Sequence, residues 1–185
     1  AFNRWEAGQR LMLRIAINAI ADSTITEGAN GQIDQNLLPD ALVQAMRAVL
    51  RHPQLDAAFK ELVLTLPSES YIAEQLTQVD PPRVHAVREA LRLQLALSLQ
   101  ADWAWAWDEH QASGAYRPDA TSSGRRALAG LALAMLCLAA RATGDQVWPG
   151  KTYQRFKIAA NMTDRFNALS ALVMKGHEQA QTALA

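Results

Sequence analysis

The tripeptide Gly150-Lys151-Thr152 resembles the end of a phosphate-binding loop, in which backbone amides and a lysine hold a nucleotide phosphate. That loop requires a glycine five residues before Gly150, where this sequence has Asp145, and no apolar strand leads into the segment. We therefore interpret the tripeptide as a helix-capping turn and do not expect nucleotide binding.

The four histidines and the single cysteine form no recognisable catalytic or metal-binding set. His52, His85, His110 and His177 are each more than twenty residues apart, whereas zinc ligands on a helix are commonly one turn apart. We expect these histidines to face solvent on helices. Cys137 lies within the apolar stretch LALAMLCLAA, where a lone thiol usually behaves as a small buried hydrophobe. The nucleophile motif G-x-S-x-G is also absent, so the sequence predicts no catalytic, metal-binding or substrate-binding residue.

Three tryptophans lie in residues 91–110, LRLQLALSLQADWAWAWDEH, where every odd-numbered position from 91 to 107 is apolar. That alternation is typical of a half-buried strand. A strand of this length would be unusual, and the stretch lacks Val, Ile and Thr, whereas Leu, Ala, Gln and Arg favour a helix. We expect one long central helix from Pro81 to about Gln111. Trp103 and Trp107 then share one face and Trp105 lies opposite, in roles of core packing or of contact with another domain.

The rest of the chain also has helical periodicity and helix-capping residues, and no strand is required. Asp56, Asp80, Asp119 and Thr163 are placed to cap helices, and Pro39 suits the first turn of one. The expected helices include 2–21, 81 to about 111 and about 153–159. Others carry the apolar residues of 42–50, 59–66, 71–76, 128–138 and 166–173.

These elements predict an all-α protein built as an irregular array or solenoid of antiparallel helix pairs, an armadillo/HEAT-like superhelix. No strict sequence period is present. At 185 residues with 50% hydrophobic side chains, residues 1–185 are expected to form one helical domain.

Charge and composition argue against several partners. Eighteen basic and eighteen acidic residues leave no net charge to attract nucleic acid or anionic lipid. The longest apolar run, residues 127–140, is shorter than the ~20 residues that span a bilayer, so no membrane span is expected. One cysteine fits a reducing, cytoplasmic compartment. The chain begins AFNRWE without a targeting signal, and we expect it to be cut from something longer.

Six stretches carry a resemblance to a known family. They are FNRWEAGQ (2–9), LPDALVQAMRAVL (38–50), LTLPSESYIAEQ (64–75), VDPPRVHAVREAL (79–91), YRPDATSSGRRAL (116–128) and NMTDRFNAL (161–169). Together they are similar to the bacterial zinc aminopeptidase N (alanyl aminopeptidase) family, in the first part of its C-terminal helical domain. The resemblance covers nearly the whole chain and occurs in family order.

The resemblance implies a non-catalytic piece of a larger zinc peptidase. In that family the zinc ligands and the glutamate base of the HExxH motif lie upstream, and none of that motif is present in this sequence. The helical domain closes over the catalytic cleft and restricts access to short peptides. The implied partners are the catalytic domain of the same chain and its peptide substrates, and the implied cofactor, zinc, is bound elsewhere. An independent helical-repeat interaction module of the same ancestry is the alternative.

Two features depart from the family pattern. Ala129-Gly130 replaces polar residues that often follow GRRAL, which suggests altered helix packing, and Pro149-Gly150 predicts a break in a helical stretch. Because the chain ends at Ala185, the final helices are expected to lack partners on one face, and self-association through that apolar face is a further hypothesis.

Overall fold

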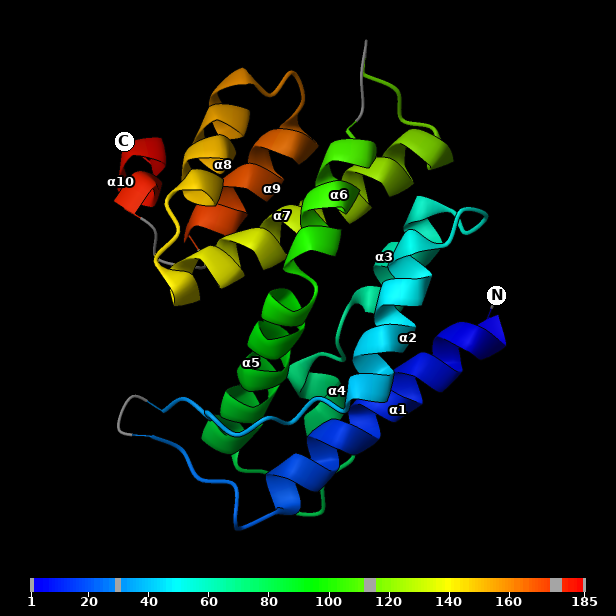
Figure 1. Ribbon diagram of the computed structural model, residues 1–185, viewed down its shortest axis with the longest axis vertical. Coiled ribbons are helices and arrows are strands. Elements are labelled where there is room, and N and C mark those ends of the chain that lie inside the picture. Colours follow the sequence, from blue (N-terminus) through cyan, green and yellow to red (C-terminus); the bar gives the residue numbers. More distant parts are fainter. Residues whose placement is uncertain (1, 29–30, 112–115, 174–177, 185) are drawn as a thin grey trace.

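The computed structural model describes residues 2–28, 31–111, 116–173 and 178–184, and these contain helices and no strand. The predicted all-α class is therefore confirmed over this part of the chain. The helices, shown in Figure 1, are α1 (Phe2–Ala21), α2 (Asp40–Arg51), α3 (Ala57–Leu64), α4 (Glu69–Ala73), α5 (Pro81–Ser98), α6 (Gln100–Glu109), α7 (Ala120–Thr143), α8 (Val147–Ile158), α9 (Met162–Val173) and α10 (Glu178–Leu184).

Side-chain caps fix the starts of several helices. The carboxylates of Asp56, Asp80 and Asp119 accept hydrogen bonds from the third backbone amide that follows, at 2.8, 3.3 and 2.9 Å respectively. Ser68 caps α4 in the same way, at 3.1 Å. Each cap satisfies an amide that has no partner inside its helix. The predicted starts at the three aspartates are confirmed.

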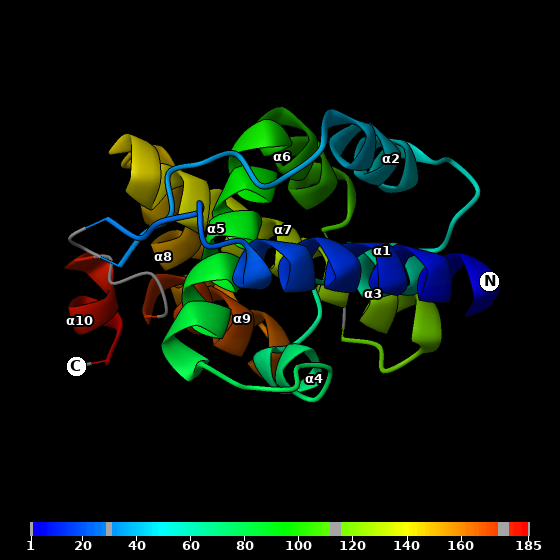
Figure 2. The same cartoon turned by 90° about the horizontal axis from the view of Figure 1, so that it is seen from below.

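Helix α7 is the centre of the fold. It packs against α3, α5, α6, α8 and α9, and Figures 1 and 2 show α10 beside the α8–α9 pair, away from α1 to α4. By length and composition α7 could span a bilayer, but 61% of its most apolar 18-residue stretch is buried among its neighbours. A continuous apolar core includes side chains from each of α1 to α9.

Two glycines let neighbouring helices approach α7 closely. A Cβ on Gly124 would lie 2.8 Å from the backbone nitrogen of Ala58 in α3, and a Cβ on Gly130 would lie 2.4 Å from Nδ2 of Asn167 in α9. Gly130 therefore leaves room for the Asn167 side chain of α9, and packing altered relative to the family stays a prediction.

The long helix expected over residues 81–111 is wrong as a single element, because α5 ends at Ser98 and α6 begins at Gln100. Leu99 between them has φ −115° and ψ 21°. The Arg47 guanidinium donates to the carbonyl of Ser98 at 3.1 Å, and the Trp103 indole donates to that of Leu95 at 3.3 Å. No proline or glycine lies at the break. The Arg47 bond satisfies a carbonyl at the end of α5 from another helix, whereas the Leu95 carbonyl also accepts from the amide of Leu99.

Two start predictions were also wrong. Pro39 precedes α2 as its N-cap instead of lying in its first turn. Pro149-Gly150 does not break a helix, because both residues lie near the start of α8, where a missing proline N–H leaves no hydrogen bond unmade.

The start of α9 also differs from the prediction. The cap is Asn161, whose side-chain oxygen accepts from the amide of Asp164 at 2.9 Å, and not Thr163. Of the side chains expected to face inward, Leu172 is buried, whereas Phe166 is 62% exposed and Val173 is 40% exposed.

Candidate functional site

The structure places the candidate chemical residues apart from one another. His85 is exposed and pairs with Glu69, as expected of a surface histidine. His110 is buried, however, so the expectation that it faces solvent is wrong. His52 is half-buried, and His177 lies outside the described residues. Among the described residues no group of three or more His, Cys, Asp or Glu side chains could hold a metal ion.

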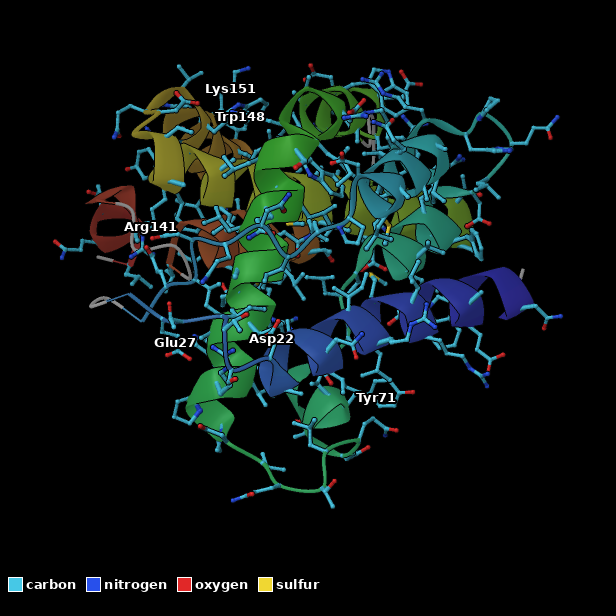
Figure 3. The ribbon with its side chains drawn as sticks, turned by 60° about the horizontal axis from the view of Figure 1, so that its bottom comes forward. Asp22, Glu27, Tyr71, Arg141, Trp148 and Lys151 are labelled. Atoms are coloured by element: carbon cyan, nitrogen blue, oxygen red, sulfur yellow. The ribbon has the colours of Figure 1, made fainter. Side chains whose placement is uncertain are left out.

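Cys137 and the Gly150-Lys151-Thr152 tripeptide take part in packing and in hydrogen bonds between α7 and α8. Cys137 is fully buried, as predicted, with its Sγ 3.1 Å from the Thr152 hydroxyl. That hydroxyl donates to the carbonyl of Trp148 at 2.7 Å. The Lys151 ammonium lies 4.4 Å from the centre of the Trp148 ring, and Figure 3 shows the two side chains together. The tripeptide lies inside α8, so its interpretation as a capping turn is wrong.

Helix α6, which contains Trp103, Trp105 and Trp107, is joined to α2 by two ion pairs of Asp102, called here the charged joint. Asp102 is 8% exposed and accepts hydrogen bonds from Nε of Arg47 at 2.9 Å and from Nε of Arg51 at 2.7 Å. Burial opposes ionisation of Asp102, but these two guanidinium groups outweigh it and lower its pKa below 3.8. Trp103 is fully buried beside this joint, which confirms a packing role for it.

Trp105, on the other side of α6, lies among cations. The Arg51 guanidinium is 4.3 Å and the Lys60 ammonium 5.7 Å from the centre of its ring, and the His110 ring meets its edge at 5.8 Å. Burial lowers the pKa of Lys60, opposed by the carboxylates of Glu109 and Asp56. Burial also lowers the pKa of His110, whose Nδ1 is 3.0 Å from the carbonyl of Ala106. The face of the Trp105 ring thus attracts the cations of Arg51 and Lys60.

An open groove of about 520 Å³ lies on the face made by α3, α7, α9 and the segment before α7. Its lining combines hydroxyl, amide, charged and apolar side chains: Glu61, Thr65, Tyr116, Ser123, Arg126, Ala127, Gly130, Leu131, Thr163 and Asn167. Arg126, Gly130 and Asn167 also line a second cavity of about 10 Å³ on the inner side, which has the size of one water molecule.

Arg126 is the residue that sequence reasoning missed in this groove. It is only 4% exposed, and its Nη2 donates to the carbonyl of Arg117 at 2.9 Å and to the Ser123 hydroxyl at 3.0 Å. The only signal in the sequence is a pair of arginines at the start of a strongly apolar helix. The groove therefore offers hydrogen-bond donors and one buried cation, an arrangement suited to binding an anionic group.

Comparison with known proteins defines the class of this fold. The family model described as "Domain of unknown function (DUF3458_C) ARM repeats" matches residues 1–185, and the chain belongs to that family of helical-repeat domains. The armadillo-like helical array predicted from the sequence agrees with this description.

Relatives point to a more particular setting. The chain is 32% identical over 183 residues to aminopeptidase N of Caulobacter vibrioides, covering 99% of this chain and 20% of the relative. It is 34% identical over 174 residues to aminopeptidase N of Escherichia coli, covering 93% of this chain and 18% of that protein. The chain thus spans about a fifth of the length of these curated relatives.

A solved structure shares the fold. Aminopeptidase A of Legionella pneumophila, crystallised in complex with aspartic acid, superposes with a TM-score of 0.75 at 23% sequence identity. The match covers 99% of this chain and 21% of that protein. The resemblance to aminopeptidases stated from the six sequence stretches is confirmed by these matches.

Proposed function

We propose that this chain is a non-catalytic helical segment of a zinc aminopeptidase that removes N-terminal amino acids from peptides. One observation carries the proposal: the two aminopeptidase N relatives match nearly the whole chain at 32% and 34% identity. The described residues offer no set of side chains that fits zinc. In keeping with the resemblance to zinc aminopeptidases, the proposal assigns the metal and the hydrolytic chemistry to other parts of the protein.

In this proposal the helical domain covers the catalytic cleft and limits which peptides enter it. The catalytic domain of the same protein is the partner, and peptides with a free N-terminus are the substrates. A cytoplasmic location is part of the proposal, since a chain with the lone buried Cys137 suits a reducing compartment.

The test begins with the reading frame upstream of residue 1. An HExxH helix followed by a downstream glutamate supports the proposal. A start codon immediately before Ala1 would favour the alternative, an independent helical-repeat interaction module. In the full-length protein, cleavage of alanine-initiated peptides should fall as the peptides lengthen, because access is restricted. A rate independent of length would contradict the cleft-covering role.

The isolated 185-residue chain provides the complementary test. It should neither bind zinc stoichiometrically, measured by metal analysis after dialysis, nor release alanine from an alanyl chromogenic substrate. The full-length protein assayed in parallel is the positive control. Turnover by the isolated chain that survives further purification would overturn the assignment of the chemistry to other parts of the protein.

Self-association of the isolated chain is the remaining part of the proposal. Ile158, Met162 and Phe166 are 72%, 76% and 62% exposed where α8 meets α9, and Met162 and Phe166 are four residues apart on one helix face. Sedimentation at rising concentration should show a dimer that Phe166→Glu removes, whereas Leu62→Glu, a similar change on α3, should leave it intact. A monomer at every concentration would refute self-association.

A further inference from the structure

The side chain of Arg126 carries a buried charge that lacks a counter-charge in the described part of the chain. Only 4% of the residue is exposed, yet none of the ion pairs formed among the described residues includes it. Buried charges in proteins are normally paired, because removing an ion from water is costly. By contrast, Arg155, which lines the adjoining inner cavity, pairs with Asp164 at 2.6 Å.

The hydrogen bonds of Arg126 leave part of its guanidinium available. Its Nη2 is bonded to the Arg117 carbonyl and the Ser123 hydroxyl, whereas the described residues provide no hydrogen-bond acceptor for Nε or Nη1. The centre of the Tyr116 ring lies 4.8 Å from the guanidinium carbon. An aromatic ring stacked on a guanidinium covers its face and leaves the N–H edge free for a carboxylate.

The surroundings of Arg126 suit a peptide better than a lone ion. The groove measures about 520 Å³, far more than a single carboxylate fills. Hydroxyl and amide groups of Thr65, Thr163 and Asn167 line it together with the apolar side chains of Ala127 and Leu131, a combination that can bond a peptide backbone and pack against its side chains. We propose that this groove binds a peptide segment whose aspartate or glutamate carboxylate pairs with Arg126.

Glu61 gives the groove a direction. Its carboxylate lies on the α3 wall, 3.2 Å from the Thr65 hydroxyl, which makes a shorter hydrogen bond of 2.9 Å to the Glu61 carbonyl. It repels a second carboxylate and attracts a cation. The acidic side chain of the bound peptide therefore lies on the Arg126 side, and a lysine or arginine of the same peptide is favoured beside Glu61.

Binding is tested on the full-length protein with two matched probes, the blocked peptides acetyl-AAEAAK-amide and acetyl-AAQAAK-amide. Acetylation removes the free amine that an aminopeptidase site requires, so the result does not depend on the proposed peptidase activity. Calorimetry should show the glutamate peptide binding at least about tenfold more tightly than the glutamine peptide, the value of one charge-assisted hydrogen bond. Equal affinities would overturn the proposal, and free glutarate binding as tightly as the peptide would overturn a peptide as the occupant.

Variants then locate the site. Arg126→Gln should abolish the preference for glutamate, but it also removes the two Nη2 bonds, so Ala127→Glu provides a second variant that leaves Arg126 in place. The new carboxylate on the groove wall should compete with the peptide and weaken binding at least about tenfold. Gln154→Glu adds the same charge on an exposed face of α8 and should leave binding unchanged. Unchanged affinity in Ala127→Glu with a native circular dichroism spectrum would refute the site.

Discussion

Replacing Asp102 with asparagine should loosen the joint between α2 and α6. The carboxylate accepts two charge-assisted hydrogen bonds, at 2.9 and 2.7 Å, and such bonds are each worth about 1.5–3 kcal/mol when buried. The Asp102 side chain is 12% exposed, but Arg47 and Arg51 are 36% and 40% exposed and regain water when released. That recovery reduces the loss, and we expect Asp102→Asn to lower the free energy of unfolding by about 2 kcal/mol.

Urea unfolding followed by circular dichroism measures this loss. With a slope of about 2 kcal/mol/M the midpoint should fall by about 1 M. Asp108→Asn is the matched control, because Asp108 is exposed on the same helix and should change stability by less than about 0.5 kcal/mol. Equal stability of Asp102→Asn and Asp108→Asn would refute the argument that the two guanidinium groups hold α6 on α2.

Acid supplies an independent check on the same residue. The pKa of Asp102 is lowered by folding despite burial, since Arg47 and Arg51 favour the charged form. Its contribution is therefore fully present above the unfolded pKa and is lost as the pH falls through the lower folded value. The stability difference between wild type and Asp102→Asn should narrow below about pH 3.8. A difference that stays constant from pH 7 to pH 3 would contradict this assignment of charge.

Two pairs of substitutions and one labelling experiment test other parts of the fold. Gly124→Ala should destabilise the protein by about 1–3 kcal/mol because the new methyl group meets the α3 backbone. Gly150 has open space around it, so Gly150→Ala should stabilise the protein by up to about 1 kcal/mol. Thermal melts measure both changes, and the opposite order would contradict the close approach of α3 to Gly124. Asn161→Ala should cost about 1 kcal/mol through loss of the α9 cap, and Thr163→Ala should cost far less; equal losses would reassign the cap. Cys137 should react with a thiol reagent only on unfolding, and fast labelling of the native chain would show that its burial is incomplete.

Three helix starts could be predicted from the sequence because their signals are local. Asp56, Asp80 and Asp119 each bond an amide three residues away, and such a pattern is visible within a few letters. The end of α5 could not be predicted in this way. No breaker residue marks it, and the contact that accompanies it comes from Arg47, which lies 51 residues from the Ser98 carbonyl that it bonds.

The groove was unpredictable for the same reason. Arg126 is buried and lacks an acidic partner among the described residues because of how the helices pack. Its neighbours in the sequence predict neither property. His110 is a second example. It was expected to face solvent, but it is buried and its ring contacts that of Trp105. Periodicity identified which elements form, but the pairing of charges between elements requires their arrangement in space.

Helix α3 can approach α7 closely because Gly124 has only a hydrogen atom as its side chain, so this position influences the geometry of the helical array. Because α3 rests against a position without a side chain, any larger residue there displaces α3, and α2 packs against α3 in turn. A homologue with alanine or serine at this position should therefore differ in the tilt of the α2–α3 pair as a unit. Divergence at this single site would change the curvature of the helical stack without altering any of its helices.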